Sequence, residues 1–174
     1  MSVVDDVKTW LQSRRTATMD HPGGTLYTHL VRVHERMHTL GLADDVCLAG
    51  LAHAAYGTDG FPVVLVDWDD RGPLRDLIGE PAEALVYRYC ACDRAATWRT
   101  LAETAEVTDR FTGRVTRLDP DPLRDFVDLS IVNELDVLEQ TGQHADYYRS
   151  LFPTWAPLAS PTVAADAAAV LARP

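Results

Sequence analysis

The sequence predicts an all-α protein, a bundle of six or seven helices that forms one domain over residues 1–174. Apolar residues recur every three or four positions in most segments, and Pro, Asp and Gly mark where those segments begin and end. Almost no stretch shows the alternation of a half-buried strand. With 174 residues, the chain is long enough for one compact domain and too short for two.

The first two helices are predicted from their caps and their apolar stripes. Ser2, with Asp5 three residues later, can cap a helix that runs to Gln12. The breaker sequence His-Pro-Gly-Gly at 21–24 separates it from the clearest helix in the chain, which ends at Gly41. The stripe of that second helix consists of Leu26, Leu30, Val33, Met37 and Leu40.

A third helix is predicted over residues 46–56, opened by one of two adjacent aspartates and closed by Gly57. Its residues are apolar or small on every side, so we expect it in the centre of the domain. His53 is its only polar interior residue. The segment that continues to Pro73 has the composition of a long loop, and such loops often carry function.

The second half of the chain contains three further predicted helices. Pro81 at a first helical position starts a long fourth helix, which we expect to continue through Leu101. Residues 109–118 show no clean period and indicate a turn or a short hairpin. The last two helices run from Leu123 to about Thr141 and onward from Ser160.

Charge and composition exclude several classes of function. Lys and Arg total 16 against 26 for Asp and Glu, and the net charge of −10 argues against binding to nucleic acid or an anionic membrane. Three cysteines fit a reducing compartment, and we find neither a signal peptide nor a membrane-spanning stretch. We therefore expect a cytoplasmic protein that acts on a small molecule.

The histidines are the first candidates for chemistry. With about 100° between successive helical residues, His29 and His34 lie about 140° apart and cannot easily bind one ion together. His38 is expected in solvent. His53, inside a helix without a polar face, needs a hydrogen bond or a metal for its ring nitrogens, and both roles stay open.

The helix from Leu123 carries a carboxylate in its apolar sector. Glu134 lies about 20° from Leu123, whereas Asn133 borders this sector and Asp136 lies on its far side. Burying a carboxylate without a cation is costly, so Glu134 is the acidic residue for which we most expect a partner.

His29 and His53 are 24 residues apart, in two characteristic settings. The first is Thr-His-Leu at 28–30, and the second is Leu-Ala-Gly-Leu-Ala-His at 48–53, with Tyr-Gly-Thr at 56–58 after it. These residues resemble the HD-domain superfamily, whose members include nucleotide phosphohydrolases, (p)ppGpp hydrolases and diiron oxygenases. The region after the second histidine is similar to the (p)ppGpp-hydrolase branch.

The resemblance covers residues 21–94 well and implies an HD-domain-like helical bundle. It makes His29 and His53 metal ligands, with a late acidic residue, Glu134 or Asp136, completing a set for Fe, Mn or Zn. Active members have an aspartate directly after the second histidine, where this chain has alanine. A standard HD phosphohydrolase site therefore cannot be assembled, and no metal binds if this loss abolishes the site.

Four further residues are candidates for catalysis. His21 and Asp59 should lie near the helix ends where this fold opens its cleft, and either can act as an acid or base. Arg94 and Arg110 can supply guanidinium groups to an anionic substrate, although pairing with the surplus carboxylates is an equally open role.

Three functions follow from these features. The first is a metal-dependent enzyme that hydrolyses a small molecule through a metal-activated water, or oxidises it if the metal is iron. The second is a metal-free enzyme or binding protein that uses His21, His29 and His53 as acid–base groups. The third is a non-catalytic HD-like interaction module. The missing aspartate favours the second and third, and the spacing of the two histidines favours the first.

Overall fold

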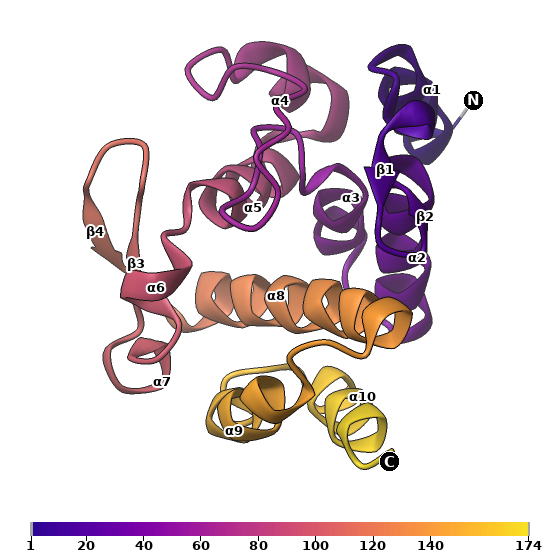
Figure 1. Cartoon of the computed structure of the whole chain (residues 1–174). Helices are drawn as coiled ribbons and strands as arrows, with labels where there is room; N and C mark the ends of the chain where they lie inside the picture. The colour runs from indigo at the N-terminus through magenta and orange to yellow at the C-terminus, as the bar shows by residue number, and fades with distance from the viewer. Residues whose placement is uncertain (1, 174) are drawn as a thin grey trace.

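A computed structural model describes residues 2–173, and the mostly helical class is confirmed (Figure 1). These residues contain ten α-helices, one 3-10 helix and two small antiparallel sheets, so six or seven helices was too low a number. The N-terminal elements are α1 (Val3–Ser13), η1 (Thr16–Thr18), β1 (Asp20–His21), β2 (Gly24–Thr25), α2 (Leu26–Thr39), α3 (Asp44–Ala52), α4 (Gly72–Ile78) and α5 (Glu80–Ala91). The C-terminal elements are α6 (Arg94–Thr97), α7 (Leu101–Thr104), β3 (Glu106–Thr108), β4 (Val115–Arg117), α8 (Pro120–Thr141), α9 (Ala145–Trp155) and α10 (Pro161–Leu171).

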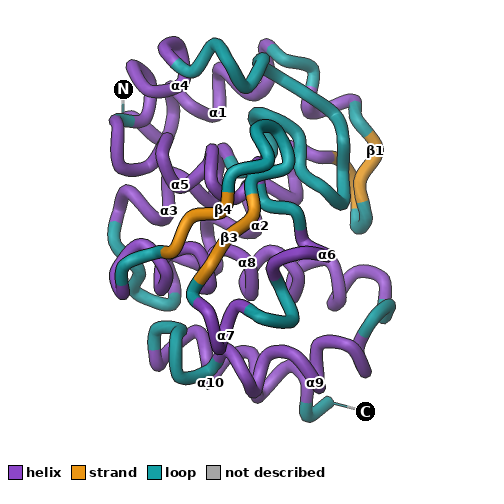
Figure 2. The backbone as a smooth tube through the Cα atoms, turned by 90° about the vertical axis from the view of Figure 1, so that its left-hand side faces the viewer, coloured by secondary structure: helices purple, strands orange, loops and turns teal. Residues whose placement is uncertain are grey.

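Helix α8 is the central element of the fold, because it packs against helices on both of its sides. It contacts α2, α3 and α5 on one side and α9 and α10 on the other (Figure 1). Its middle is buried almost all round, from Phe126 to Asp136. Figure 2 faces the β3–β4 hairpin, whose first strand contacts α6. Polar residues on the inner turns of α8 are therefore forced to find partners on neighbouring helices.

Close packing of α2 on α3 sets the position of the later site. The stripe residues within α2, from Leu26 to Met37, are fully buried, and Val33 and Met37 lie against α3 at Gly50. A Cβ atom at Gly50 would lie 2.3 Å from the Met37 sulfur, so a larger residue would force the Met37 side chain to move. Because His53 follows Gly50 by one helical turn, this contact brings its ring toward His29 on α2.

Several predicted elements need correction. The helix from Pro81 does not continue through Leu101, because Cys92 has extended backbone angles and Asp93 caps a new helix by accepting a hydrogen bond from the backbone N–H of Ala96. The helix expected over 46–56 ends at Ala52, and turns follow it.

The sequence analysis missed two helices, and two of its other local predictions are confirmed. Helix α4 lies at the end of the predicted long loop, and α9 contains Pro153 in its interior. The capping box of Ser2 with Asp5 is confirmed, as is the hairpin near residues 109–118. None of the helices in the described part of the chain combines the length and apolar character that crossing a membrane requires.

Candidate functional site

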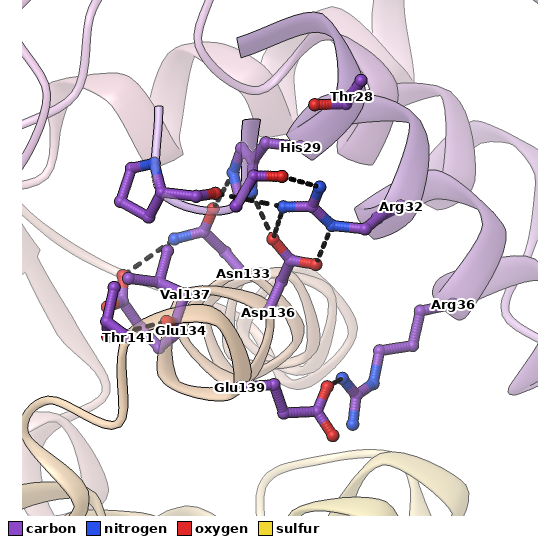
Figure 3. Close-up of polar contacts among 12 residues, drawn as sticks. Thr28, His29, Arg32, Arg36, Asn133, Glu134, Asp136, Val137, Glu139 and Thr141 are labelled. Carbon is purple, nitrogen blue, oxygen red and sulfur yellow. Dashed lines mark hydrogen bonds and ion pairs between the residues drawn. The ribbon is translucent and has the colours of Figure 1, made fainter. Parts of the chain in front are cut away.

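The site centres on His29, a buried residue of α2 that contacts α8 through both ring nitrogens (Figure 3). Its Nδ1 atom lies 2.6 Å from the Oδ2 atom of Asp136. Arg32, one turn further along α2, donates two hydrogen bonds of 2.7 and 2.8 Å to the two oxygens of the same carboxylate. Figure 3 shows Asp136 held between these two side chains.

Asp136 fixes the orientation and tautomer of the His29 ring. Burial alone would raise the pKa of Asp136, but the hydrogen bonds from His29 and Arg32 outweigh it and lower the pKa to about 2. An ionised carboxylate only accepts hydrogen bonds, so Nδ1 of His29 carries a proton and donates it. The Nε2 atom of His29 is left to face the interior of the site.

Two acceptor atoms, one from His53 and one from Asn133, lie close to the Nε2 atom of His29. The Nε2 atom lies 3.2 Å from Nε2 of His53 and 2.9 Å from Oδ1 of Asn133. Nδ1 of His53 lies 2.7 Å from the carbonyl oxygen of Gly50, so that nitrogen carries the proton and Nε2 has the lone pair. Burial, with His29 nearby, lowers the pKa of His53 to about 3, and the ring is neutral at pH 7.

Asn133 points its oxygen at the two histidines because its amide nitrogen is already used. The Nδ2 atom donates a 2.8 Å hydrogen bond to Oε1 of Glu134, which leaves Oδ1 facing His29. When His29 is neutral, the lone pair of its Nε2 atom therefore faces both the lone pair of His53 and the amide oxygen of Asn133. Such an arrangement needs a proton or a cation at its centre.

Glu134, the carboxylate expected to need a cation, has one. Its Oε1 atom lies 2.9 Å from Nη1 of Arg94, and the hydroxyl of Tyr148 donates to its other oxygen. Burial and the Glu134 charge both raise the pKa of Tyr148, so the hydroxyl stays protonated. Arg94 also donates to the hydroxyl of Tyr89, 2.9 Å away. The buried charge of Glu134 is thus balanced within the site.

His21, on β1, lies over the ring of His29. The two ring centroids are 4.0 Å apart with 24° between the planes, and Phe61 contacts His21 edge-on. The Nδ1 atom of His21 is buried and has no hydrogen-bond partner among residues 2–173. Burial, and to a lesser extent the nearby His29, lowers the pKa of His21 to about 4. A neutral imidazole with an unused ring nitrogen therefore faces the site.

These residues surround a cavity of about 360 Å³. A space of this size suits a small molecule. Its wall includes Ala54, the residue that follows His53. The remaining lining residues are His21, Pro22, Leu26, His29, His53, Thr58, Gly60, Phe61, Arg94, Asn133, Glu134, Val137, Thr141, Gln143, His144 and Tyr148.

Two of the predicted catalytic residues have structural contacts and do not line this cavity. Asp59 is exposed and accepts a 3.0 Å hydrogen bond from the backbone N–H of Arg94. Arg110 donates to the carbonyl oxygens of Cys90 and Gly57, at 2.9 and 3.1 Å, and so ties the hairpin to the helix α5 and the loop after α3. The sequence suggested Asp59 through its position near a helix end and Arg110 through its guanidinium group.

Neither of the predicted late ligands, Glu134 and Asp136, contacts Nε2 of His29, whereas Oδ1 of Asn133 does. Asp136 contacts Nδ1 of His29, on the opposite side of the ring from His53, so those two residues cannot share one ion with His29. The oxygens of Glu134 are taken by Arg94, Asn133 and Tyr148. Among residues 2–173, no three His, Cys, Asp or Glu side chains gather as a metal-ligating group.

Two supporting residues were missed by the sequence analysis. Arg32 follows His29 by three residues on the same helix, and that spacing was the available signal for a shared partner. Tyr148 lies on α9, a helix that was not predicted, so nothing placed it near Glu134.

Comparison with known proteins adds one finding. A family described as a domain of unknown function, DUF6817, matches residues 10–94. The matched part contains His21, His29 and His53, and it ends before α8 with Asn133 and Asp136. No curated protein and no solved structure matches the chain.

Proposed function

We propose that this chain is a hydrolase of HD-domain-like architecture that binds one divalent transition metal and acts on a small anionic substrate. The observation that carries the proposal is that Nε2 of His29 lies 3.2 Å from Nε2 of His53 and 2.9 Å from Oδ1 of Asn133. The HD resemblance implies that two histidines and a residue of a late helix hold the metal. His29 and His53 are the two histidines, and Asn133 lies on the late helix α8.

The residues fit a metal of the Fe(II), Mn(II) or Zn(II) class. Imidazole nitrogens suit all three ions, and an amide oxygen is an acceptable further ligand. Asp136 accepts a hydrogen bond from Nδ1 of His29, an arrangement that commonly fixes the ring of a ligating histidine. All three ligands are neutral, so the positive charge of the metal remains available to attract an anion.

When bound, such a metal would lower the pKa of a water molecule and polarise a substrate oxygen. Arg94 lies in the same cavity, where its guanidinium can orient an anionic group while Glu134 keeps it in place. His21 is neutral at pH 7 and has an unused ring nitrogen, so it is available as a general base towards a bound water. We favour hydrolysis over oxidation because hydrolysis needs this proton acceptor beside the reacting centre.

A second candidate function is metal-free acid–base catalysis. The 3.2 Å separation of the two Nε2 atoms also suits one proton held between His29 and His53. Asp136 would then balance the charge of a protonated His29. In this alternative the same cavity holds an acid–base pair, and Asn133 only accepts a hydrogen bond from His29.

Elemental analysis of the purified protein distinguishes the two candidates. We expect about one Fe, Mn or Zn per chain, which His53→Ala and Asn133→Ala should each remove. His38→Ala is the matched control, because that histidine is exposed on α2. A folded wild-type protein that takes up no metal from excess Mn²⁺, Fe²⁺ or Zn²⁺ would overturn the metal proposal.

Hydrolysis of a panel of small phosphate and carboxylate esters tests the activity itself. We expect turnover that depends on added metal and falls sharply in His21→Gln, which retains the metal. Metal-independent turnover that His29→Gln abolishes would instead favour the acid–base alternative.

A further inference from the structure

A second cavity, of about 430 Å³, lies between α5 and the β3–β4 hairpin. Tyr87 and Arg88 of α5 line it, whereas the next residue, Tyr89, contacts His53 and Arg94 of the first site. The hairpin contributes Arg114 and the apolar residue Val107. Helix α5 therefore lines the second cavity and, through Tyr89, contacts two residues that line the first.

Two charged residues of this cavity are already satisfied. Arg71 donates two 2.7 Å hydrogen bonds to the oxygens of Glu83, and its guanidinium lies 4.0 Å from the centre of the Tyr87 ring. Asp109 accepts hydrogen bonds from the Tyr87 hydroxyl and from two backbone N–H groups of the hairpin turn. These groups shape the wall and leave little capacity for a ligand.

Arg88 and Arg114 are different, because neither guanidinium has a hydrogen bond or an ion pair with any group in residues 2–173. Arg88 is half-buried, and this burial lowers the pKa of its guanidinium. Asp125 on α8 attracts it but lies beyond ion-pair distance. In a chain with 26 acidic residues, a partly buried arginine without a partner is unusual, since desolvating an unpaired charge is costly.

We propose that this second cavity binds a small organic anion, with its carboxylate or phosphate held by Arg88 and Arg114. Guanidinium groups present parallel N–H donors that match both kinds of oxyanion. Val107, Leu118 and the Tyr87 ring supply an apolar wall for the rest of the molecule. The volume is that of an ordinary small-molecule site, and the ligand restores the charge balance that the protein lacks here.

Calorimetric titration of the metal-free protein tests this site independently of the proposed function. The probes are phenyl phosphate, benzoate and the uncharged benzyl alcohol. We expect saturable binding of at least one of the two anions and none of benzyl alcohol, and the tighter anion identifies the oxyanion. Anion binding should weaken by about tenfold or more in Arg88→Met/Arg114→Gln.

Arg117→Gln is the matched control, because that arginine is an exposed hairpin residue outside the cavity. It should leave the affinity unchanged. If the double variant fails to fold, Arg114→Gln alone provides the test on an exposed residue. Unchanged affinity in the cavity variants, an equal loss in Arg117→Gln, or no saturable anion binding would overturn the proposal.

Discussion

The two cavities beside α5 differ in how their charges are balanced. In the first, Glu134 is paired with Arg94, and Asp136 is paired with Arg32. In the second, Arg88 and Arg114 have no such partner in the described part of the chain. The ion pairs of the first site thus fix the side chains around His29 and Asn133, whereas the arginines of the second cavity have no carboxylate partner.

The largest expected effect comes from exchanging the paired arginine for an apolar residue. Arg94→Met leaves the buried carboxylate of Glu134 without its cation and should lower the free energy of unfolding by about 3–5 kcal/mol. Urea unfolding followed by circular dichroism measures this change. A loss below about 1 kcal/mol would show that Glu134 does not depend on the pair.

The next effect is the pH dependence of the metal-free protein. His53 has a pKa of about 3 in the folded state and about 6.5 when unfolded, so the unfolded state binds a proton first as the pH falls. Stability should therefore decrease below pH 6.5, by about 2 kcal/mol from this histidine between pH 6.5 and pH 5. Unfolding measured at several pH values should show a weaker dependence in His53→Gln than in His38→Gln. Equal slopes in the two variants would contradict a neutral, buried His53.

A smaller effect is expected from the hydroxyl that supports Glu134. Tyr148→Phe removes one hydrogen bond to the carboxylate and should cost about 1–3 kcal/mol in the free energy of unfolding. Tyr147→Phe is the matched control, since its hydroxyl has no hydrogen bond within residues 2–173. The assignment fails if both variants unfold at the same urea concentration.

The smallest effect belongs to the second cavity. Arg88→Met removes an unpaired, partly desolvated charge and should change the free energy of unfolding by less than about 1 kcal/mol, in either direction. Compared with Arg94→Met, it tests the contrast between the two cavities with the same substitution. Equal losses in the two variants would remove that contrast.

Much of the scaffold follows from local sequence patterns. The stripe of α2 and the small residues of α3 predicted two packed helices, and the position of Glu134 in an apolar sector predicted its need for a cation. The break at Cys92 was missed because it depends on a new cap at Asp93, although the apolar spacing continues across it.

The finer assignment on α8 was not predictable from periodicity. Asn133 borders the apolar sector and Asp136 lies on its far side, and a helical wheel does not tell which neighbouring helix each one faces. That choice depends on Arg32 of α2, which draws Asp136 to the rear of His29 and leaves Asn133 at its front. Whether Arg88 is paired likewise depends on the hairpin and α8, which are distant in sequence.

Anomalous X-ray diffraction from crystals grown with Mn²⁺ or Zn²⁺ tests the central claim most directly. We predict one dominant anomalous peak between His29, His53 and Asn133, with metal–nitrogen distances of about 2.0–2.2 Å. Asn133→Ala should weaken this peak, and His38→Ala should not change it. A peak elsewhere, or none at saturating metal with the three side chains still in direct contact, would contradict the account.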